Sequence, residues 1–305
     1  MSTMKLEGLR TDAPPSVKRY LWSPRRWALS LASLLVASCG HFSFSNGGDN
    51  GGVDAGDAGG DAGDGAVDAG DAGVDAALPT DGLIAWFPMD QAITTDSTGI
   101  GTFADASRHN NNGTCDPGSC PTFEPHPTGR SGGAYTFDGI NDLFHVPSTP
   151  ALEGNEGFTI TAWIKRAESS LSACVINKSY QTGGDNSWQA CIRGDDGEVE
   201  VHSADGGMGG DDLDGGTVDT SAWHHLALWW NGSSKATYVD GAFVVGTRPP
   251  KTVSIPFDNA DIDIGSDYDV NTATKFQSPL KGLIADVRIY NRALSPAEIM
   301  ALASQ

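Results

Sequence analysis

Lys281-Gly-Leu-Ile-Ala-Asp-Val-Arg-Ile-Tyr-Asn-Arg-Ala-Leu-Ser-Pro-Ala-Glu-Ile-Met300 is the stretch that decides the fold, because it reads as a β-strand followed directly by a short helix. In its second half Ser295 can cap a helix that begins at Pro296, and Glu298 completes a capping box. Its first half has a period of two, which predicts a strand with two distinct faces. One face would carry Leu283, Ala285, Val287 and Ile289, and the other Ile284, Asp286, Arg288 and Tyr290.

One acid, Asp286, interrupts the middle of this predicted strand. A carboxylate among half-buried residues needs a hydrogen-bond donor, a cation or a metal beside it, because moving an unpaired charge out of water is costly. Asp286 is therefore the first candidate functional residue of the chain.

Residues 80–305 contain many short apolar or alternating runs, separated by Gly, Asn and Asp. This spacing predicts an all-β fold, a sandwich or jelly roll, and roughly 225 residues fit one large domain of that class. Asp240-Gly241 predicts a two-residue hairpin, because both residue types tolerate positive φ. The Gly- and Asp-rich segment 203–216 is expected to be a loop, either a solvated connection or a ligand or calcium loop. Only the residues after Ser295 look helical.

The N-terminal region carries an export signal. Basic residues including Arg25 and Arg26 precede an apolar run, from Trp27 to Ser38, that is too short to span a bilayer. The run ends at Val36-Ala-Ser-Cys39, which resembles a bacterial lipobox. The resemblance implies that residues 1–38 are a lipoprotein signal peptide and that Cys39 is diacylated. The protein would then be exported and lipid-anchored in the cell envelope, at the outer membrane or the cell surface. A buried helix with a chance cysteine is the alternative, and translation could instead begin at Met4.

With Cys39 lipidated, an even number of cysteines remains, which predicts disulfides in an exported chain. Among the possible pairings we expect Cys115 with Cys120 and Cys174 with Cys191. Each of these pairs falls within what reads as one loop or one hairpin.

Residues 39–79 are predicted to form an acidic, flexible tether rich in Gly, Ala and Asp. From 46 to 77 there are only a few valines and no aromatic residue, so burial cannot offset the entropy of ordering. Calcium-binding β-roll repeats are the alternative. The mostly three-residue spacing and the lack of a regular large apolar residue argue against them.

The formal net charge of the chain is −20 at pH 7. Such a surface repels phosphate backbones, so nucleic acid is excluded as a partner. Solubility and the binding of divalent cations explain the acidity equally well.

A set of segments, taken together, resembles the laminin-G-like domains of the concanavalin A-like lectin/glucanase superfamily. They occur in the order seen there: Gly82–Asp90, Asn111–Thr114, Gly133–Asp142, Phe158–Ile164, Trp223–Leu226, Tyr238–Gly241 and Gly282–Leu294. The resemblance implies a jelly roll of two curved antiparallel sheets in which the first strand pairs near the last.

The same resemblance implies a structural calcium ion where the first strand's acid, a Phe-Asp-Gly turn and the last strand's acid converge. The matching positions are Asp90, Asp138 and Asp286, with Asn141 and Asp142 as weaker candidates. Calcium takes roughly six to eight oxygen ligands, which carboxylates and turn carbonyls supply. The alternative is that Asp138 and Asn141 cap turns and that Asp286 pairs with an arginine.

Glucanases of this superfamily carry a Glu-x-Asp-x-x-Glu strand, and that pattern is absent from the sequence. Glu198 and Glu200 share a strand face with His202, but neighbours on one face do not oppose each other across a substrate. His224 and His225 have no evident nucleophile beside them and are expected to be structural. The sequence favours a non-catalytic domain, with a divergent glycoside hydrolase as the alternative.

Aromatic side chains on such a sandwich can stack on sugar rings. The candidate ligand contacts are Trp188, Trp229, Trp230 and Tyr238, with core packing as the alternative for each. The expected function is a membrane-anchored recognition module for a glycan or a protein. A structural envelope protein without a soluble ligand is a further alternative.

Overall fold

Two antiparallel sheets pack face to face in the computed structural model, which describes residues 78–152, 157–168, 171–180, 185–204, 210–247, 259–268 and 276–305. The predicted signal peptide, Cys39 and nearly all of the tether lie outside these residues. No helix in the described part of the chain is long and apolar enough to cross a membrane.

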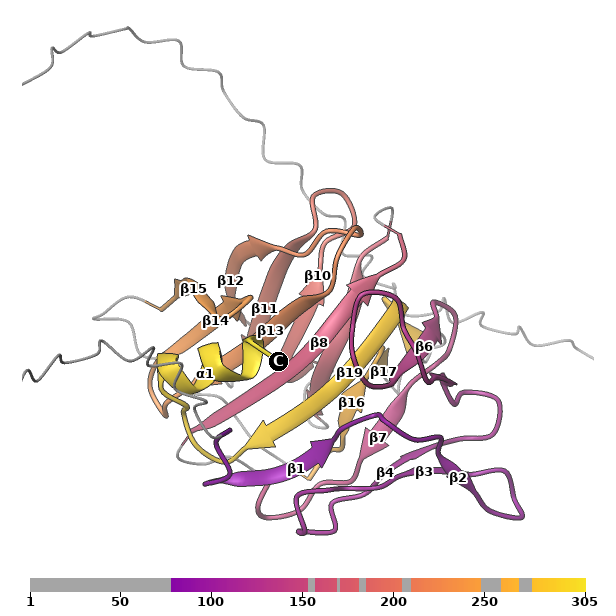
Figure 1. The fold of residues 1–305 in the computed structure, drawn as a ribbon. Helices are drawn as coiled ribbons and strands as arrows, with labels where there is room; N and C mark the ends of the chain where they lie inside the picture. Colours follow the sequence, from indigo (N-terminus) through magenta and orange to yellow (C-terminus); the bar gives the residue numbers. More distant parts are fainter. Residues whose placement is uncertain are drawn as a thin grey trace, which may run out of the picture. The chain divides into compact units, whose positions relative to one another are not determined.

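The first sheet has eight strands, and its centre is the pair β8 and β19, which run side by side in Figure 1. Its order is β15 (Ala242–Gly246), β14 (Lys235–Val239), β13 (His224–Trp230), β8 (Phe158–Arg166), β19 (Lys281–Tyr290), β6 (Ala134–Asp138) and β5 (Thr122–Glu124). The eighth strand, β1 (Leu83–Phe87), also pairs with β19. First and last strands therefore meet, as the resemblance implies.

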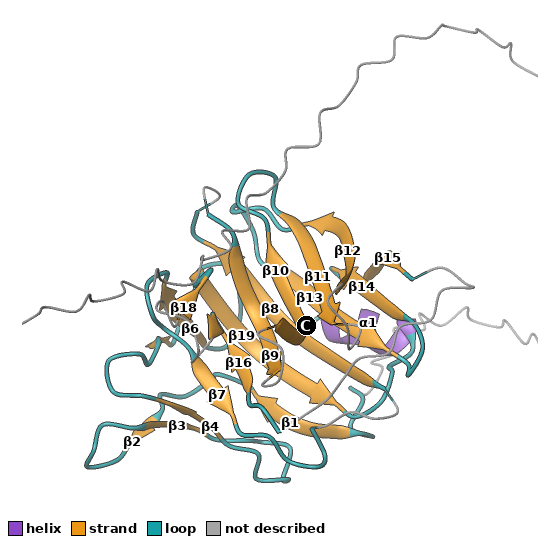
Figure 2. Ribbon diagram, turned by 180° about the vertical axis from the view of Figure 1, so that it is seen from behind, coloured by secondary structure: helices purple, strands orange, loops and turns teal. Residues whose placement is uncertain are grey.

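The second sheet has nine strands, several of which are visible from behind in Figure 2. Its order is β12 (Gly210–Thr217), β11 (Glu198–Ala204), β10 (Asp185–Ile192), β9 (Ala173–Tyr180), β16 (Ile262–Ile264), β7 (Phe144–Val146), β4 (Gly113–Cys115), β3 (Gly101–Phe103) and β2 (Thr94–Thr95). A separate ribbon joins β17 (Asp267–Tyr268) to β18 (Phe276–Gln277). The second half of the predicted 203–216 loop is thus strand β12, since main-chain pairing with β11 does not require apolar side chains.

The main core lies between the sheets and is built from the inward sides of both. Large aromatic residues contact each other across it, with Phe103 stacked on Phe144 and Phe158 beside Trp188. A second apolar cluster lies on the outer face of the eight-stranded sheet, where Ile299 and Leu302 of helix α1 (Pro296–Ala303) are buried. The helix therefore covers part of one outer face of the sandwich.

Strand β19 departs from the simple alternation expected of it. The pairing with β8 shifts between Ala285 and Arg288, and Asp286 has φ of 49°. This bulge reverses the face pattern, so Ile284 and Val287 both point into the main core. The bulge lies where one of the two neighbours of β19 changes: β6 pairs with residues up to Ile284, and β1 pairs with residues from Val287 onward.

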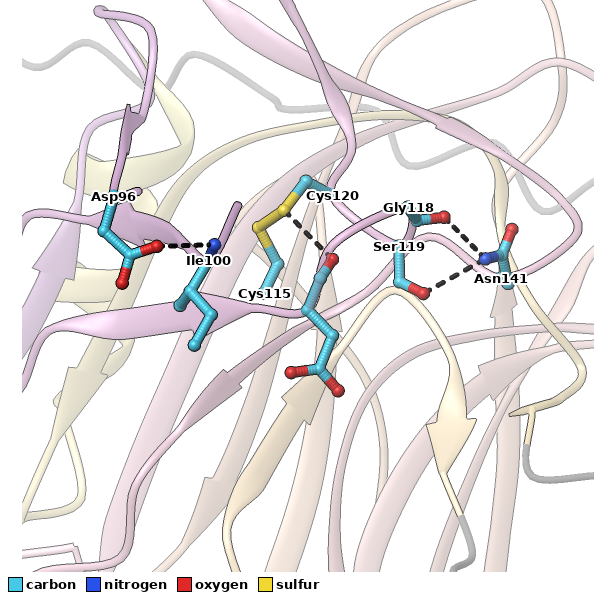
Figure 3. Close-up of a disulfide and its surroundings, with 8 residues drawn as sticks. Asp96, Ile100, Cys115, Gly118, Ser119, Cys120 and Asn141 are labelled. Atoms are coloured by element: carbon cyan, nitrogen blue, oxygen red, sulfur yellow. Dashed lines mark hydrogen bonds between the residues drawn. A yellow bond between two sulfur atoms is a disulfide. The ribbon is translucent and has the colours of Figure 1, made fainter. Parts of the chain in front are cut away.

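The predicted local features are confirmed. The Ser295 side chain accepts from the Glu298 backbone N–H, and the Glu298 carboxylate accepts from the Ser295 N–H, which completes the capping box. Asp240 and Gly241 form the β14–β15 turn with φ values of 52° and 77°. Both predicted disulfides are present, one of which is drawn in Figure 3: Cys115–Cys120 and Cys174–Cys191.

Candidate functional site

A row of polar side chains crosses the outer face of the nine-stranded sheet, opposite the face that α1 covers. Cross-strand pairing places these residues at one register, from β2 to β12: Thr94, Thr102, Thr114, His145, Asp263, Asn177, Gln189, His202 and Asp212. Side chains directly opposite each other on neighbouring strands share a face. Their sequence neighbours, such as Phe144 and Val146, belong to the main core, so the row faces outward.

His145 and Asp263 form the tightest contact in this row, with 2.5 Å between Nδ1 and Oδ1. Burial raises the pKa of Asp263 to about 6, although the hydrogen bond and charge of His145 oppose the shift. Burial also disfavours the charged form of His145, but the hydrogen bond and charge of Asp263 outweigh it and raise the pKa of His145. The Asp263 side chain is almost fully buried and the His145 side chain is 19% exposed. The pair therefore fixes the imidazole while leaving the His145 side chain partly exposed to solvent.

The short strand β17 lies beside this pair. The Tyr268 ring meets the His145 ring edge-on, with 5.1 Å between centroids. The Asn177 amide donates from Nδ2 to Asp267 Oδ1 at 2.8 Å, and its own carbonyl oxygen, Oδ1, is buried without a hydrogen-bond partner among the described residues. We call these five residues the His145 cluster: His145, Asn177, Asp263, Asp267 and Tyr268.

At the other end of the row, His202 contacts Asp212, with 2.6 Å between Nδ1 and Oδ1. Glu200 lies on the same face and is half-buried, and burial together with Asp214 and Asp212 raises its pKa. Glu198 forms an ion pair with Arg193.

The acids predicted to bind calcium do not converge. Asp138 lies opposite Lys281 in the β6–β19 pairing, whereas Asp286 follows five positions later, about 15 Å along an extended strand. Asp90 lies near Gly133, just before the other end of β6. No group of three or more His, Cys, Asp or Glu residues in the described part of the chain is arranged to hold a metal ion.

Asp138, Asn141 and Asp142 do share one turn, where they cap the backbone. Asp138 Oδ1 accepts from the N–H groups of Ile140 and Asn141, and Asp142 Oδ2 accepts from the Asp138 N–H. Asn141 donates to Gly118 O and to the Ser119 hydroxyl beside the disulfide in Figure 3. Burial, with the charge of Asp138, raises the pKa of Asp142 to about 6. Two carboxylates alone fall short of a calcium coordination shell, so any ion here would depend on backbone oxygens and water.

Asp286 pairs with an arginine, which is the alternative to calcium that the sequence left open. Its Oδ1 accepts from Arg288 Nε at 3.0 Å and from Trp86 Nε1 at 2.7 Å. Asp286 is 8% exposed and Arg288 4% exposed. The carboxylate is therefore committed to a buried ion pair at the bulge.

The four aromatic residues predicted to contact a ligand are all used in packing, which is the alternative considered for each of them. Trp188 and Trp230 are buried in the main core. Tyr238 lies in the cluster under α1, and Trp229 packs against that cluster and donates from Nε1 to Leu294 O at 2.9 Å. Sequence alternation alone did not reveal that the outer face was also covered.

Sequence reasoning missed the His145 cluster. Its only local signal is a polar residue framed by two apolar ones, as in Phe144-His145-Val146 and Ile262-Asp263-Ile264. These two segments lie more than a hundred positions apart, and only the pairing of β7 with β16 joins them.

Comparisons with known proteins agree with the two-sheet fold described above. A family model described as "Concanavalin A-like lectin/glucanases superfamily" matches residues 138–300, which is more than half of the chain. A search of curated protein sequences finds no significant match.

Solved structures share the fold at low sequence identity. Domain 4 of AbnA, a GH43 extracellular arabinanase from Geobacillus stearothermophilus, in complex with arabinotriose, is 19% identical with a TM-score of 0.51, and the match covers 72% of this chain and 98% of that one. The binding domain of Paraclostridial Mosquitocidal Protein 1 is 16% identical, with a TM-score of 0.53 and coverage of 73% and 52%. Trypanosoma rangeli sialidase in complex with sialic acid is 14% identical, with a TM-score of 0.54 and coverage of 75% and 33%.

This chain thus spans about half of the mosquitocidal binding domain and a third of the sialidase. Sheet order, the closure of the first strand on the last and the family match lead to one conclusion. The chain belongs to the concanavalin A-like lectin/glucanases superfamily.

Proposed function

We propose that this protein is a non-catalytic glycan-recognition module, held in the bacterial cell envelope by a lipid on Cys39. The observation that carries the proposal is the row of hydrogen-bonding side chains across the outer face of the nine-stranded sheet, with the His145 cluster in the middle part of the row. Sugar hydroxyls both donate and accept hydrogen bonds. A surface that offers imidazole, carboxylate and amide groups side by side is therefore complementary to them.

The His145 cluster has the features of a preorganised binding site. Asp263 fixes the imidazole through Nδ1, and the His145 side chain remains partly exposed. Tyr268 adds an aromatic ring beside it. The fully buried Asn177 donates to Asp267 Oδ1 and so helps to order this part of the cluster. Holding groups in place before binding reduces the entropy lost when a ligand arrives.

The comparisons support the same proposal at the level of fold. The arabinanase domain 4 was solved with arabinotriose and the sialidase with sialic acid.

The decisive experiment is a glycan array probed with residues 78–305 and with two variants. His145→Gln removes the imidazole that the cluster fixes, and His126→Gln is the control, because His126 is exposed and follows β5 of the eight-stranded sheet, which does not carry the row. Far-UV circular dichroism checks that both variants fold. We expect His145→Gln to lose binding at least tenfold and His126→Gln to bind as the wild type does. Equal binding by both variants, or no glycan bound by the wild type, would overturn the proposal.

A divergent hydrolase is the second candidate, and the raised pKa of Glu200 favours it. Glu200 lies opposite Asp214 on the neighbouring strand, so two acids are close together. They lie side by side on one surface, however, whereas a glycosidase needs two carboxyl groups that flank the bond. Turnover in a polysaccharide hydrolysis screen that disappears in Glu200→Gln would establish the hydrolase and reject the non-catalytic module.

The anchor is tested separately by expressing the full chain in a bacterial host. The wild type should partition into the membrane fraction and incorporate labelled fatty acid, and Cys39→Ser should do neither. The same distribution for both proteins would refute a lipid anchor on Cys39.

A further inference from the structure

A second group of functional side chains lies on the opposite outer face, on the part of the eight-stranded sheet that carries Arg288 and Trp163. Its residues come from β1, β8, β13, β19 and the loops before β6 and β13. We call them the Arg130 cluster: Trp86, Arg130, Trp163, Trp223, His225, Asp286 and Arg288.

Arg130 lies between two aromatic rings. Its guanidinium carbon is 4.6 Å from the Trp163 ring centroid and 5.9 Å from that of Trp223. Cation–π contacts hold the group in place but leave its N–H donors unused. The guanidinium makes no hydrogen bond or ion pair with any residue that the structure describes. Burial, together with the charge of Arg288, lowers the pKa of Arg130, while Asp286 raises it.

Two further polar atoms beside Arg130 have no partner among the described residues. The Trp163 Nε1 is buried without a hydrogen-bond acceptor, and so is Nδ1 of His225. The ring centroids of these residues are 5.4 Å apart, and His225 is only 2% exposed. A buried donor without an acceptor is costly and is rare in native proteins. Burial lowers the pKa of His225 to about 4, so its ring is neutral at pH 7 and can donate from one nitrogen.

The charges around this point leave an excess of positive charge. Arg130 and Arg288 face Asp286, whose Oδ1 is already held by Arg288 and Trp86. Asp240 is the other acid near His225, and it accepts from the His225 N–H and from His224 Nδ1. Arg288 also donates to Gln305 Oε1. No acid in the described part of the chain pairs with Arg130, although the whole chain carries a net charge of −20.

We propose that the Arg130 cluster is a binding site for an oxyanion, a carboxylate or sulfate group carried by an acidic ligand. Guanidinium matches such groups with two parallel N–H donors, and a charge-assisted hydrogen bond is stronger than a neutral one. The Trp163 N–H and the neutral His225 ring supply further donors. The site lies on the other face from the His145 cluster, so it can take its ligand whether or not that cluster binds a sugar.

The test is a fluorescence titration of residues 78–305 with sodium glucuronate and with sodium sulfate, at constant ionic strength set by sodium chloride. Tryptophan emission reports the site directly, because Trp86, Trp163 and Trp223 belong to it. We expect saturable binding of at least one of the two anions by the wild type. Saturation by glucuronate alone assigns the site to acidic sugars, and saturation by sulfate assigns it to sulfated ligands.

Two variants and a control make the assignment specific. Arg130→Gln removes the unpaired guanidinium, and Trp163→Phe keeps a ring but removes the N–H. Arg108→Gln removes the same charge from an exposed position and is the control. We expect affinity to fall at least tenfold in Arg130→Gln, to fall in Trp163→Phe and to stay unchanged in Arg108→Gln. Equal affinity in the wild type and Arg130→Gln, or no saturable response by the wild type to either anion, would overturn the proposal.

Discussion

Replacing Asp286 should destabilise the domain strongly, because its carboxylate is the only charged partner that the buried Arg288 has among the residues the structure describes. Asp286→Asn removes the charge but keeps an oxygen for Trp86 Nε1, and asparagine tolerates the positive φ of 49°. Among the described residues, Arg288, which is 4% exposed, is then left with neutral partners alone: the substituted amide oxygen, the Gln305 amide, the Tyr290 hydroxyl and the Trp86 ring. Breaking one side of a buried ion pair costs about 3–5 kcal/mol. We take the lower end, about 3 kcal/mol, because these partners remain.

Asp286→Ala should cost more than Asp286→Asn. It removes the acceptor for Trp86 as well, and a left-handed backbone costs alanine about 1 kcal/mol or more. The expected loss is therefore about 4 kcal/mol. For a domain of this size, a loss of 3 kcal/mol lowers Tm by about 10 °C. Asp195→Asn, at an exposed position without an ion pair to any described residue, is the matched control and should change stability by less than about 0.5 kcal/mol.

The assay is urea unfolding followed by tryptophan fluorescence and by circular dichroism, so that coincident curves verify a single transition. Removing the stranded charge in Asp286→Asn/Arg288→Met should recover part of the loss, because the two substitutions act on one contact. A loss below about 1 kcal/mol in Asp286→Asn would refute the argument that Arg288 depends on this carboxylate. So would a double variant less stable than the sum of the two single losses.

Three further outcomes are expected. Burial raises the pKa of Asp142 from 3.8 to about 6, so between these pH values the folded state binds more protons than the unfolded one. The free energy of unfolding of the wild type should therefore fall, relative to that of Asp142→Asn, as the pH rises from about 4 to about 6. Parallel pH profiles of the two proteins would contradict this. Replacing Cys174 and Cys191 with serine opens a link between residues 17 positions apart and should cost about 3 kcal/mol in urea unfolding, while an unchanged midpoint would show that the bridge contributes nothing. Calcium binding remains a prediction. If calcium binds at the turn that holds Asp138, it should raise Tm in the wild type and in Asp286→Asn but not in Asp138→Asn. Calorimetric melting of the wild type that is identical with calcium and with a chelator would reject calcium binding.

The sequence predicted those parts of the fold that depend on short-range rules. The capping box at Ser295, the hairpin at Asp240-Gly241 and the local disulfides each involve residues close in the chain, where residue type and spacing already determine the geometry. The ordered set of family-like segments added the long-range closure of β1 on β19.

The site was predicted less well, because it depends on which face of each strand is covered. Trp188 and Trp229 looked alike in sequence, yet one lies in the main core and the other packs against the cluster under α1. The bulge at Asp286 reversed the expected faces of β19, and the alternation of residue types in the sequence did not predict this bulge. His145 and Asp263 were not recognised, since each is an ordinary alternating residue until their strands pair.

Composition and pattern by themselves thus determined the all-β class and the acidity of this chain, and they predict that it is exported. These properties follow from burial, entropy and charge summed along the sequence, and they do not depend on which distant residues meet. Only the tertiary structure decided that Asp286 belongs to Arg288 and Trp86 and that His145 belongs to Asp263. The physical reason is that a buried charge takes the partner that packing brings within hydrogen-bond distance, and that partner is chosen by strand register.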